Sequence, residues 1–564
     1  MGPRIRDLAA PSDPRIGGPA ARAVAAGSTG LDPRIRRGPS GNPAGAPPPA
    51  LPGAATPWWD PTARRHACTE DLPGEYHQQQ ANTVYHPGLG GRGEVHAIGG
   101  SLLSAADREA VELPLARFLE AYEVPNAALA LLDGSGRLVH CAGLTNLALY
   151  QTIDQPPAWA GPHSSFRVGS VSKTLTAWAI MKLADLGIVD NMEVRLYEYV
   201  DLQRIPEAVE RGLVGRDWIP GKRDGRDAGT SRDRITLKHL LTHRGGGFDD
   251  GYSKSKTRAG AVADVYPYVT YTKNGFRGVM DKNISSFQEE MAATNRATWP
   301  VTHDHMLRYF NMWPLAFEPG SHFCYSNLGY WMLGRVVESA SCRGYESFVR
   351  EALLRPLGMR DTRIGPDLST DRGVGEMPVF GYHWPGGSGT QPSESQSYQT
   401  SSGSYTGNDL DDYEPYAERR LRLTDAPGGW ISSAYDLALY ARETFYRQSL
   451  FQHDVWYREM LQYQGATGQG QGMGYGWESG GWHGKGSWFK VGHVPGGAAD
   501  VYFEGTSPRS RGLTMVVMYN RFNFTGNDAA DKATDKAMRK LVVAAMQAMT
   551  VPTGGQDLFR VLPP

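Results

Sequence analysis

The sequence lacks the features that mark membrane, secreted and nucleic-acid-binding proteins. No apolar run approaches the roughly 20 residues that cross a bilayer, and the first residues lack the apolar core of a secretory signal. Lysine plus arginine number 58 against 59 for aspartate plus glutamate, so no excess charge favours nucleic acid or an anionic membrane. We therefore expect a cytoplasmic protein with no nucleic-acid partner and no membrane span.

Cysteine is scarce as well, with four residues in 564. The chain has neither a C-x-x-C pair nor a cysteine–histidine spacing typical of zinc ligands, and its thiols are scattered: Cys68, Cys141, Cys324 and Cys342. This argues against a zinc site and against a small secreted fold held by disulfides. We expect isolated buried thiols, and we expect neither a metal nor another cofactor.

The length of 564 residues exceeds what a single hydrophobic core usually serves, which predicts two lobes or two domains. Residues 1–57 are rich in Pro, Gly, Ala and Arg without apolar periodicity, so we expect a disordered tail there. An N-terminal extension over 58–100 should precede the main domain over 101–552. Residues 553–564 should form a C-terminal tail.

Short apolar runs at both ends of the main domain predict two β-hairpins. One joins residues 127–132 to 138–141 through the turn Asp133-Gly134-Ser135-Gly136, and the other joins 501–503 to 513–518. Hairpins placed this far apart in the chain indicate one antiparallel sheet to which both ends contribute.

Amphipathic segments beside these hairpins predict two helices, one over 104–121 with Ser104 as N-cap and one over 529–549 with Asp528 as cap. Long helical stretches lie between the hairpins. This pattern favours the α+β class, with an antiparallel sheet built from both termini, flanking helices, and a mostly helical lobe inserted over about 190–430. A cleft between two such lobes is a favoured place for a site.

Two stretches read as long loops, over about 248–300 and about 380–425, and both are rich in tyrosine. Long loops in a compact enzyme often form the walls of its active site. An equally good interpretation is that these loops lie on the surface and take no part in the site.

Ser170 and Lys173 form the first candidate catalytic pair. They open an apolar segment over 175–186 that Gly187 ends, which predicts a buried helix. Side chains three residues apart share one helix face, and a helix N-terminus favours an alkoxide or oxyanion. A lysine desolvated beside such a group can act as a base. The alternative, a capping serine and a surface lysine, does not explain why a lysine opens a buried helix.

Tyr325 and Asn327 form the second candidate pair. They follow a Pro319-Gly320 turn and precede the apolar segment 328–337, which predicts a loop entering a helix. Residues two apart in an extended segment point the same way, so they can supply a phenolic base and an amide donor. In the alternative interpretation, Ser326 or Asn327 caps the helix and the tyrosine belongs to the core.

The third candidate segment, Lys490-Val491-Gly492-His493, stands just before the last hairpin. A strand that carries a lysine and then a glycine, which permits close backbone approach, can hold an acyl substrate and lend a backbone N–H. His493 is the rival for the cationic role. We favour Lys490, because the glycine then follows two residues later and Pro495-Gly496 forms a turn.

These three segments, in this order, resemble the penicillin-recognising serine hydrolases, which comprise β-lactamases, D-Ala-D-Ala peptidases and related esterases with S-x-x-K and K-T-G signatures. Residues 166–173, 235–243 and 427–437 resemble further stretches of that family, and the last carries Ser433 and Asp436 at the spacing of a capping box. The resemblance spans roughly 100–550 and implies a β-lactamase/transpeptidase-like fold. The Y-x-N form is similar to the class C β-lactamase and esterase branch.

The resemblance implies a role for each candidate. Ser170 would be the nucleophile, Lys173 its proton acceptor or relay, and Tyr325 the general base and acid. Lys490 would lower the pKa of Tyr325 and assist proton transfer. Asn327 would hold the substrate.

In the same resemblance, Gly492 and His493 belong to the substrate-binding strand, and the N–H groups of Ser170 and His493 would form the oxyanion hole. Val491 stands where the family usually has Thr or Ser. The hydroxyl that would bind a substrate carboxylate is therefore missing, which favours esters, amides or acyl transfer over β-lactams and D-Ala-D-Ala peptides. We expect His243 to be only a turn residue.

The sequence thus predicts a serine hydrolase that acts on a small-molecule acyl or peptide substrate through an acyl-serine intermediate, as an esterase, D-aminopeptidase or β-lactamase-like enzyme. An acyltransferase or peptide cyclase that uses the same acyl-enzyme is the alternative. A third hypothesis is a non-catalytic scaffold protein. This hypothesis predicts that Ser170, Lys173 or Tyr325 has been lost, but all three are present.

Overall fold

A computed structural model describes the following residues: 83–90, 93–152, 156–199, 222–223, 226–227, 234–246, 303, 318–366, 371–379, 421–422, 424–467, 471–480, 486–494, 496–505, 512–522, 528–551 and 554–562. The tail predicted over 1–57 and the loop predicted over 248–300 lie outside these residues, as does nearly all of the loop predicted over 380–425.

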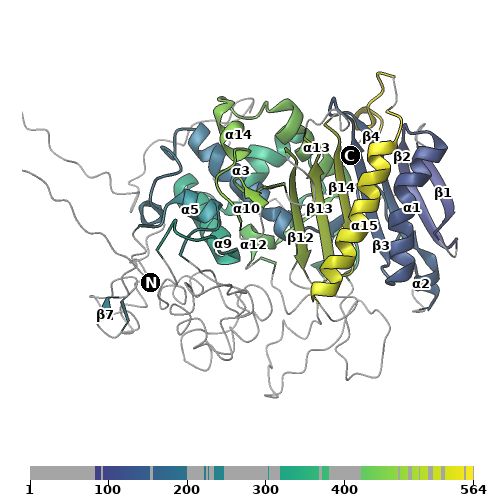
Figure 1. Cartoon of the computed structure of the whole chain (residues 1–564), viewed down its shortest axis with the longest axis horizontal. Coiled ribbons are helices and arrows are strands. Elements are labelled where there is room, and N and C mark those ends of the chain that lie inside the picture. Colours follow the sequence, from purple (N-terminus) through teal and green to yellow (C-terminus); the bar gives the residue numbers. More distant parts are fainter. Residues whose placement is uncertain are drawn as a thin grey trace, which may run out of the picture. The chain divides into compact units, whose positions relative to one another are not determined.

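Nine of the described strands form one antiparallel sheet in the order β1-β2-β4-β3-β14-β13-β12-β11-β10. Its strands are β1 (Thr83–Leu89), β2 (Val95–Ser101), β3 (Asn126–Leu132), β4 (Leu138–Asn146), β10 (Gln471–Met473), β11 (Glu478–Gly480), β12 (Trp488–Val494), β13 (Gly497–Phe503) and β14 (Thr514–Tyr519). Because β3 pairs with β14, the early and late strands meet in mid-sheet (Figure 1). The predicted sheet built from both termini is confirmed.

Both predicted hairpins are present, and the first shows how its turn is fixed. The Asp133 carboxylate accepts the backbone N–H groups of Ser135 at 2.9 Å and Arg137 at 3.1 Å, which closes the chain between β3 and β4. Gly136 adopts a φ of 77° there, a conformation that glycine adopts without strain. Every residue of β3 and β4 is buried, because helices cover both faces of the sheet.

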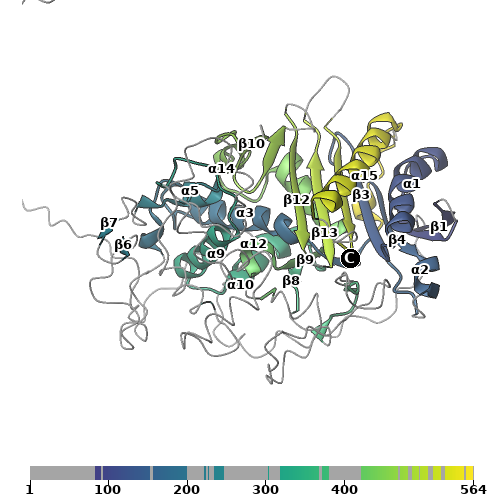
Figure 2. The ribbon, with the colours of Figure 1, turned by 60° about the horizontal axis from the view of Figure 1, so that its bottom comes forward.

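One face of the sheet is covered by α1 (Ala105–Ala121) and α15 (Asp528–Ala548), which pack against each other. They bury an apolar cluster that includes Leu115 and Leu119 from α1. The predicted cap of α1 is confirmed, since Ser104 Oγ accepts the N–H of Asp107 at 3.1 Å. Figure 2 shows both helices on the same side of the sheet.

The opposite face packs against α13 (Ala434–Arg442) and a mostly helical lobe, and one apolar cluster joins the sheet to this lobe. Its central helix, α3 (Ser172–Asp185), is buried along its whole length and ends before Gly187, as predicted. The predicted cap of α13 is also present, because Ser433 Oγ accepts the N–H of Asp436. The other described helices are α2 (Leu147–Thr152), α5 (Leu237–Leu241), α9 (Asn327–Ser341), α10 (Tyr345–Val349), α11 (Arg355–Leu357), α12 (Asp425–Gly428) and α14 (Val455–Met460).

Among the described residues, five short strands lie outside the large sheet. They are β5 (Ser165–Arg167), β8 (Arg363–Ile364) and β9 (Trp430–Ser433), which form a small sheet beneath the nucleophile segment, and the pair β6 (Lys222–Arg223) and β7 (Arg226–Asp227). The α+β class and a mostly helical lobe are therefore confirmed, and this lobe includes α3, which precedes the predicted start at about residue 190.

Two expectations need correction. The boundary placed at residue 100 falls inside β2, which pairs with β4, so the chain from Thr83 onward belongs to the sheet and is not a separate extension. The thiols are not all buried: Cys141 and Cys324 are, but Cys342 is exposed, and none of these three described cysteines forms a disulfide. Within the described ranges, no helix is long and apolar enough to cross a membrane.

Candidate active site

Ser170 lies in a single 3-10 turn, Gly169–Val171, that leads directly into α3. Lys173, one turn later, is fully buried, and its Nζ donates to Ser170 Oγ at 3.0 Å. The same Nζ donates to Asn327 Oδ1 at 2.5 Å and to the Pro427 carbonyl at 2.7 Å. Three acceptors match the three protons of an ammonium group. Asn327 on α9 and Pro427 on α12 therefore hold Lys173 beside the serine.

Tyr325 is the residue before the N-cap of α9, and its hydroxyl donates to Ser170 Oγ at 2.8 Å. The capping role falls to Ser326, whose Oγ accepts the N–H of Gly329 at 2.9 Å. Ser326 therefore caps the helix, as the alternative interpretation expected, but the Tyr325 side chain points at the serine and not into the core. Asn327 begins α9 and turns its amide oxygen to Lys173.

Strand β12 directs its two candidate cations to opposite faces, as alternation along a strand requires. Lys490 is fully buried, and its Nζ lies 4.9 Å from the centre of the Tyr325 ring. His493 faces α15 instead, where its Nε2 lies 2.9 Å from Asp535 Oδ2 and its ring stacks on Phe522. The structure therefore brings Lys490, and not the His493 side chain, to Tyr325. The intervening Val491 packs on the same side as His493, against the cluster under α1 and α15.

Gly492 lets the backbone of β12 touch the nucleophile turn. A Cβ added to Gly492 would lie 2.0 Å from the Val168 carbonyl oxygen and 2.7 Å from the Ser170 nitrogen. From the other side, a Cβ on Gly169 would lie 3.0 Å from the His493 nitrogen. The backbone nitrogens of Ser170 and His493 therefore both lie at the contact between β12 and the nucleophile turn.

Sequence reasoning treated His243 as a turn residue only. It does occupy a turn, with a φ of 56°, but its buried ring also stacks on Tyr325 with centroids 4.2 Å apart. Its Nδ1 accepts the N–H of Ser326 at 3.0 Å. Burial, together with the charges of Lys490 and Lys173, holds the pKa of His243 well below its ordinary value, so the ring is neutral. The family-like stretch over 235–243 was the signal that could have found it.

Sequence reasoning missed Glu478 entirely. This residue opens β11, its side chain is 20% exposed, and its Oε1 accepts a hydrogen bond from Lys490 Nζ at 2.8 Å. Burial on its own would lower the pKa of Lys490, but the Glu478 carboxylate and Tyr325 together outweigh it, so the pKa is raised. Glu478 lies in the segment Tyr475-Gly476-Trp477-Glu478, which carries no local signal for this contact.

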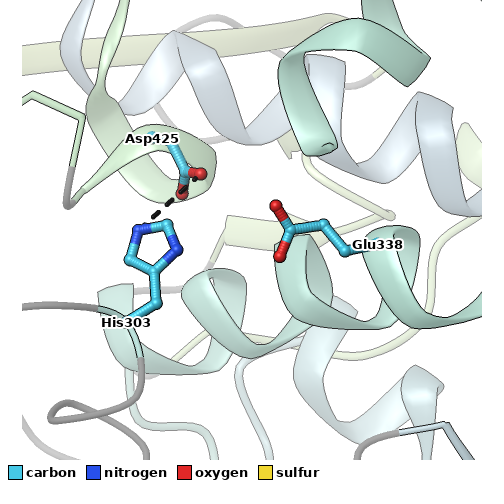
Figure 3. Close-up of side chains that lie close together, drawn as sticks. All are labelled: His303, Glu338 and Asp425. Carbon is cyan, nitrogen blue, oxygen red and sulfur yellow. Dashed lines mark ion pairs between the residues drawn. The ribbon is translucent and has the colours of Figure 1, made fainter. Parts of the chain in front are cut away.

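One group of side chains outside this site has the composition of a metal site. His303, Glu338 and Asp425 point toward a common centre, as Figure 3 shows. Arg335 already engages all three: it donates to Asp425 at 2.7 Å, lies 2.8 Å from Glu338, and contacts His303 Nδ1. A guanidinium supplies the positive charge that a metal ion would bring. We interpret the group as an ion-pair network that joins α9 to α12.

Comparisons with known proteins show which proteins the chain is similar to. The chain is 26% identical to a probable hydrolase of Phoma sp. over 39% of this chain and 35% of that protein. It is 40% identical to a penicillin-binding protein of Bacillus subtilis over 36% and 31% of the two chains. It is 23% identical to a monacolin J acid methylbutanoyltransferase of Aspergillus terreus over 44% and 50%. The first two matches span only about a third of each relative's length.

The family model described as Beta-lactamase matches residues 114–538, about three quarters of the 564 residues. That range contains the nucleophile turn, the Tyr325 loop and strand β12, so the match includes every segment that meets at Ser170. The chain belongs to the β-lactamase family.

Proposed function

We propose that the chain is a serine hydrolase that cleaves small esters or amides through an acyl intermediate on Ser170. The observation that carries this proposal is the convergence of two side chains on Ser170 Oγ, Lys173 Nζ at 3.0 Å and Tyr325 Oη at 2.8 Å. A serine hydroxyl is a weak nucleophile unless an adjacent group takes its proton. Both neighbours can exchange a proton with it.

In this proposal Tyr325 is the proton acceptor, because Lys173 already donates to three acceptors, as an ammonium group does. The positive charge of Lys490, 4.9 Å from the Tyr325 ring, favours the ionised phenol. Ionised Tyr325 takes the Ser170 proton while Oγ bonds to the carbonyl carbon of the substrate. The tetrahedral oxyanion is held by the N–H groups of Ser170 and His493.

The second half of the cycle returns each group to its starting state. Tyr325 gives its proton to the departing alcohol or amine, and the acyl group stays on Ser170. A water molecule then loses a proton to Tyr325 and attacks the acyl carbon. The bond to Oγ breaks, Ser170 recovers the proton, and the free acid leaves.

The substrate class follows from β12. Val491 carries no hydroxyl and packs away from Ser170, so this strand offers no side-chain donor for a substrate carboxylate at that position. We therefore propose neutral esters or amides as acyl donors rather than β-lactams or D-Ala-D-Ala peptides.

The second candidate function is an acyltransferase or peptide cyclase, and the similarity to a methylbutanoyltransferase supports this candidate. The same acyl-enzyme serves if an alcohol or amine replaces water in the second step. Adding a primary alcohol or amine during turnover separates the two: transfer product that exceeds the free acid at low acceptor concentration supports the transferase.

The test of the first proposal is hydrolysis of p-nitrophenyl butyrate by the wild type, Ser170→Ala and Ser487→Ala. Ser487 is a matched control, because it also stands three residues before a lysine, Lys490. We expect turnover by the wild type and by Ser487→Ala, and none by Ser170→Ala. Equal activity in all three proteins would show that Ser170 is not the nucleophile.

A further inference from the structure

The ammonium group of Lys490 is shared between Tyr325 and a carboxylate. Lys490 Nζ lies 4.9 Å from the centre of the Tyr325 ring and 2.8 Å from Glu478 Oε1. Lys490 is fully buried, whereas the Glu478 side chain reaches solvent with 20% of its surface. Glu478 thus stands behind Lys490, and a continuous chain of polar contacts runs from this carboxylate through Lys490 and Tyr325 to Ser170.

The groups around Tyr325 come from five places in the fold, and two of them are neutral. His243, after α5, is neutral for the reasons given above. Burial raises the pKa of Tyr330, on α9, well above its ordinary value, so this phenol is neutral too. The charged neighbours are Lys173 on α3, Lys490 on β12 and Glu478 on β11.

This arrangement gives Glu478 a specific effect. Two lysines near one phenol favour its ionised form strongly, and a carboxylate bonded to one of them offsets part of that effect. The carboxylate also anchors a long, flexible side chain, which would otherwise lose conformational entropy each time it approached Tyr325. Glu478 therefore affects the proton of Tyr325 in two ways: it fixes the position of Lys490, and its negative charge offsets that of the lysine.

We infer that Glu478 is a positioning residue that holds Lys490 against Tyr325 and, by balancing its charge, sets the pH range in which Tyr325 acts as the base. The inference rests on the proposed function, in which Tyr325 takes the Ser170 proton. Glu478 touches neither the nucleophile nor the expected position of the acyl group; it acts through Lys490.

The decisive experiment compares the pH dependence of kcat/KM for a neutral p-nitrophenyl ester in the wild type and in Glu478→Gln. Glutamine keeps the shape and an oxygen acceptor for Lys490 but removes the negative charge. We expect the acidic limb to move down by about one pH unit, since the uncompensated lysine favours the phenolate. The basic limb should move down as well, because Lys490 then loses its proton more easily. Because both limbs move in the same direction, the pH optimum should shift to lower pH.

Two further variants separate this effect from a structural one. Glu478→Asp keeps the charge, so its pH profile should stay where the wild-type profile lies even if the shorter side chain slows turnover. Glu504→Gln removes a buried carboxylate that accepts a hydrogen bond from Gln547 Nε2 on α15 and has no hydrogen bond to Lys490 or Tyr325 in the part of the chain that the structure describes. Its profile should not move.

The outcomes are distinguishable. If Glu478→Gln lowers kcat/KM equally at every pH, or its profile stays where that of Glu504→Gln lies, Glu478 is structural only and the inference is wrong. A profile that moves in Glu478→Asp as far as in Glu478→Gln also contradicts it. If the wild type shows no turnover that depends on Ser170, the proposed function itself has failed, which the Ser170→Ala comparison reveals separately.

Discussion

Replacing Gly492 with alanine should disable the site through the backbone alone. The new Cβ would lie 2.0 Å from the Val168 carbonyl oxygen and 2.7 Å from the Ser170 nitrogen, and both are backbone atoms that cannot rotate away. Strand β12 must therefore retreat from the nucleophile turn by about 1 Å, which takes the His493 N–H out of reach of an oxyanion. Loss of one such donor lowers kcat by about 100- to 1000-fold.

The variant will also lose stability, so a matched control is needed. Gly99 in β2 is equally crowded, since an added Cβ would lie 2.1 Å from the Cys141 carbonyl oxygen and 2.5 Å from Ala142 Cα. Overpacking of this kind costs about 1–3 kcal/mol at either position. Gly99→Ala lies on the β4 side of the sheet, away from Ser170, and should keep the kcat of its folded fraction.

The assay is kcat for p-nitrophenyl butyrate together with urea denaturation of the three proteins, so that activity is expressed per folded molecule. If Gly492→Ala keeps its kcat, β12 does not supply an oxyanion donor. If Gly99→Ala loses as much kcat as Gly492→Ala, the loss comes from the fold in general. Either result would refute the reasoning.

Four other variants test three residues, Lys173 and His243 in the site and Asp535 in α15. Lys173→Met removes the donor of three hydrogen bonds and should lower kcat by about 100-fold or more, measured with the same ester; an unchanged kcat would remove Lys173 from the mechanism. His243→Ala should slow turnover by about tenfold through a displaced Tyr325 ring, while His243→Asn, which tolerates positive φ and keeps an acceptor for Ser326, should recover part of it; equal rates in both would contradict this positioning role. Burial would raise the pKa of Asp535, but Arg539 and His493 lower it to about 2, so the stability that Asp535 provides is complete above its unfolded pKa and is lost as pH falls toward 2. Urea midpoints should therefore fall less between pH 7 and pH 3 in Asp535→Asn than in the wild type, and parallel curves would show that Asp535 does not carry this dependence.

Local sequence patterns predicted several helices and strands, because the capping and turn residues that determine their ends act on neighbours a few positions away. A capping serine three residues before an aspartate fixed the start of α1 at Ser104, and the Asp133 turn fixed the first hairpin. Strands β1 and β2 escaped prediction for a physical reason. β2 contains Gly99 and Gly100, which carry no apolar side chain to reveal its alternation, and Gly99 is needed there because the backbone of β4 lies so close.

The candidate site needed information that no local pattern holds. Ser170, Tyr325 and Lys490 lie more than 150 residues apart along the chain, and only the resemblance of their segments to one family placed them together. Strand alternation decides between Lys490 and His493, but only once the buried face of β12 is known. Glu478 and His243 were missed or undervalued because their contacts with Lys490 and Tyr325 are purely tertiary.

The ion-pair network around Arg335 affects the site although it lies outside it. Asp425, its buried carboxylate, begins the short helix α12, and Pro427 in the same turn supplies a carbonyl to Lys173 Nζ. A helix of one turn has little stability of its own, so its position depends on tertiary anchors. Arg335 holds it to α9, and α9 also begins with Asn327, the second acceptor of Lys173. Two of the three acceptors that fix the lysine therefore belong to elements that one guanidinium ties together.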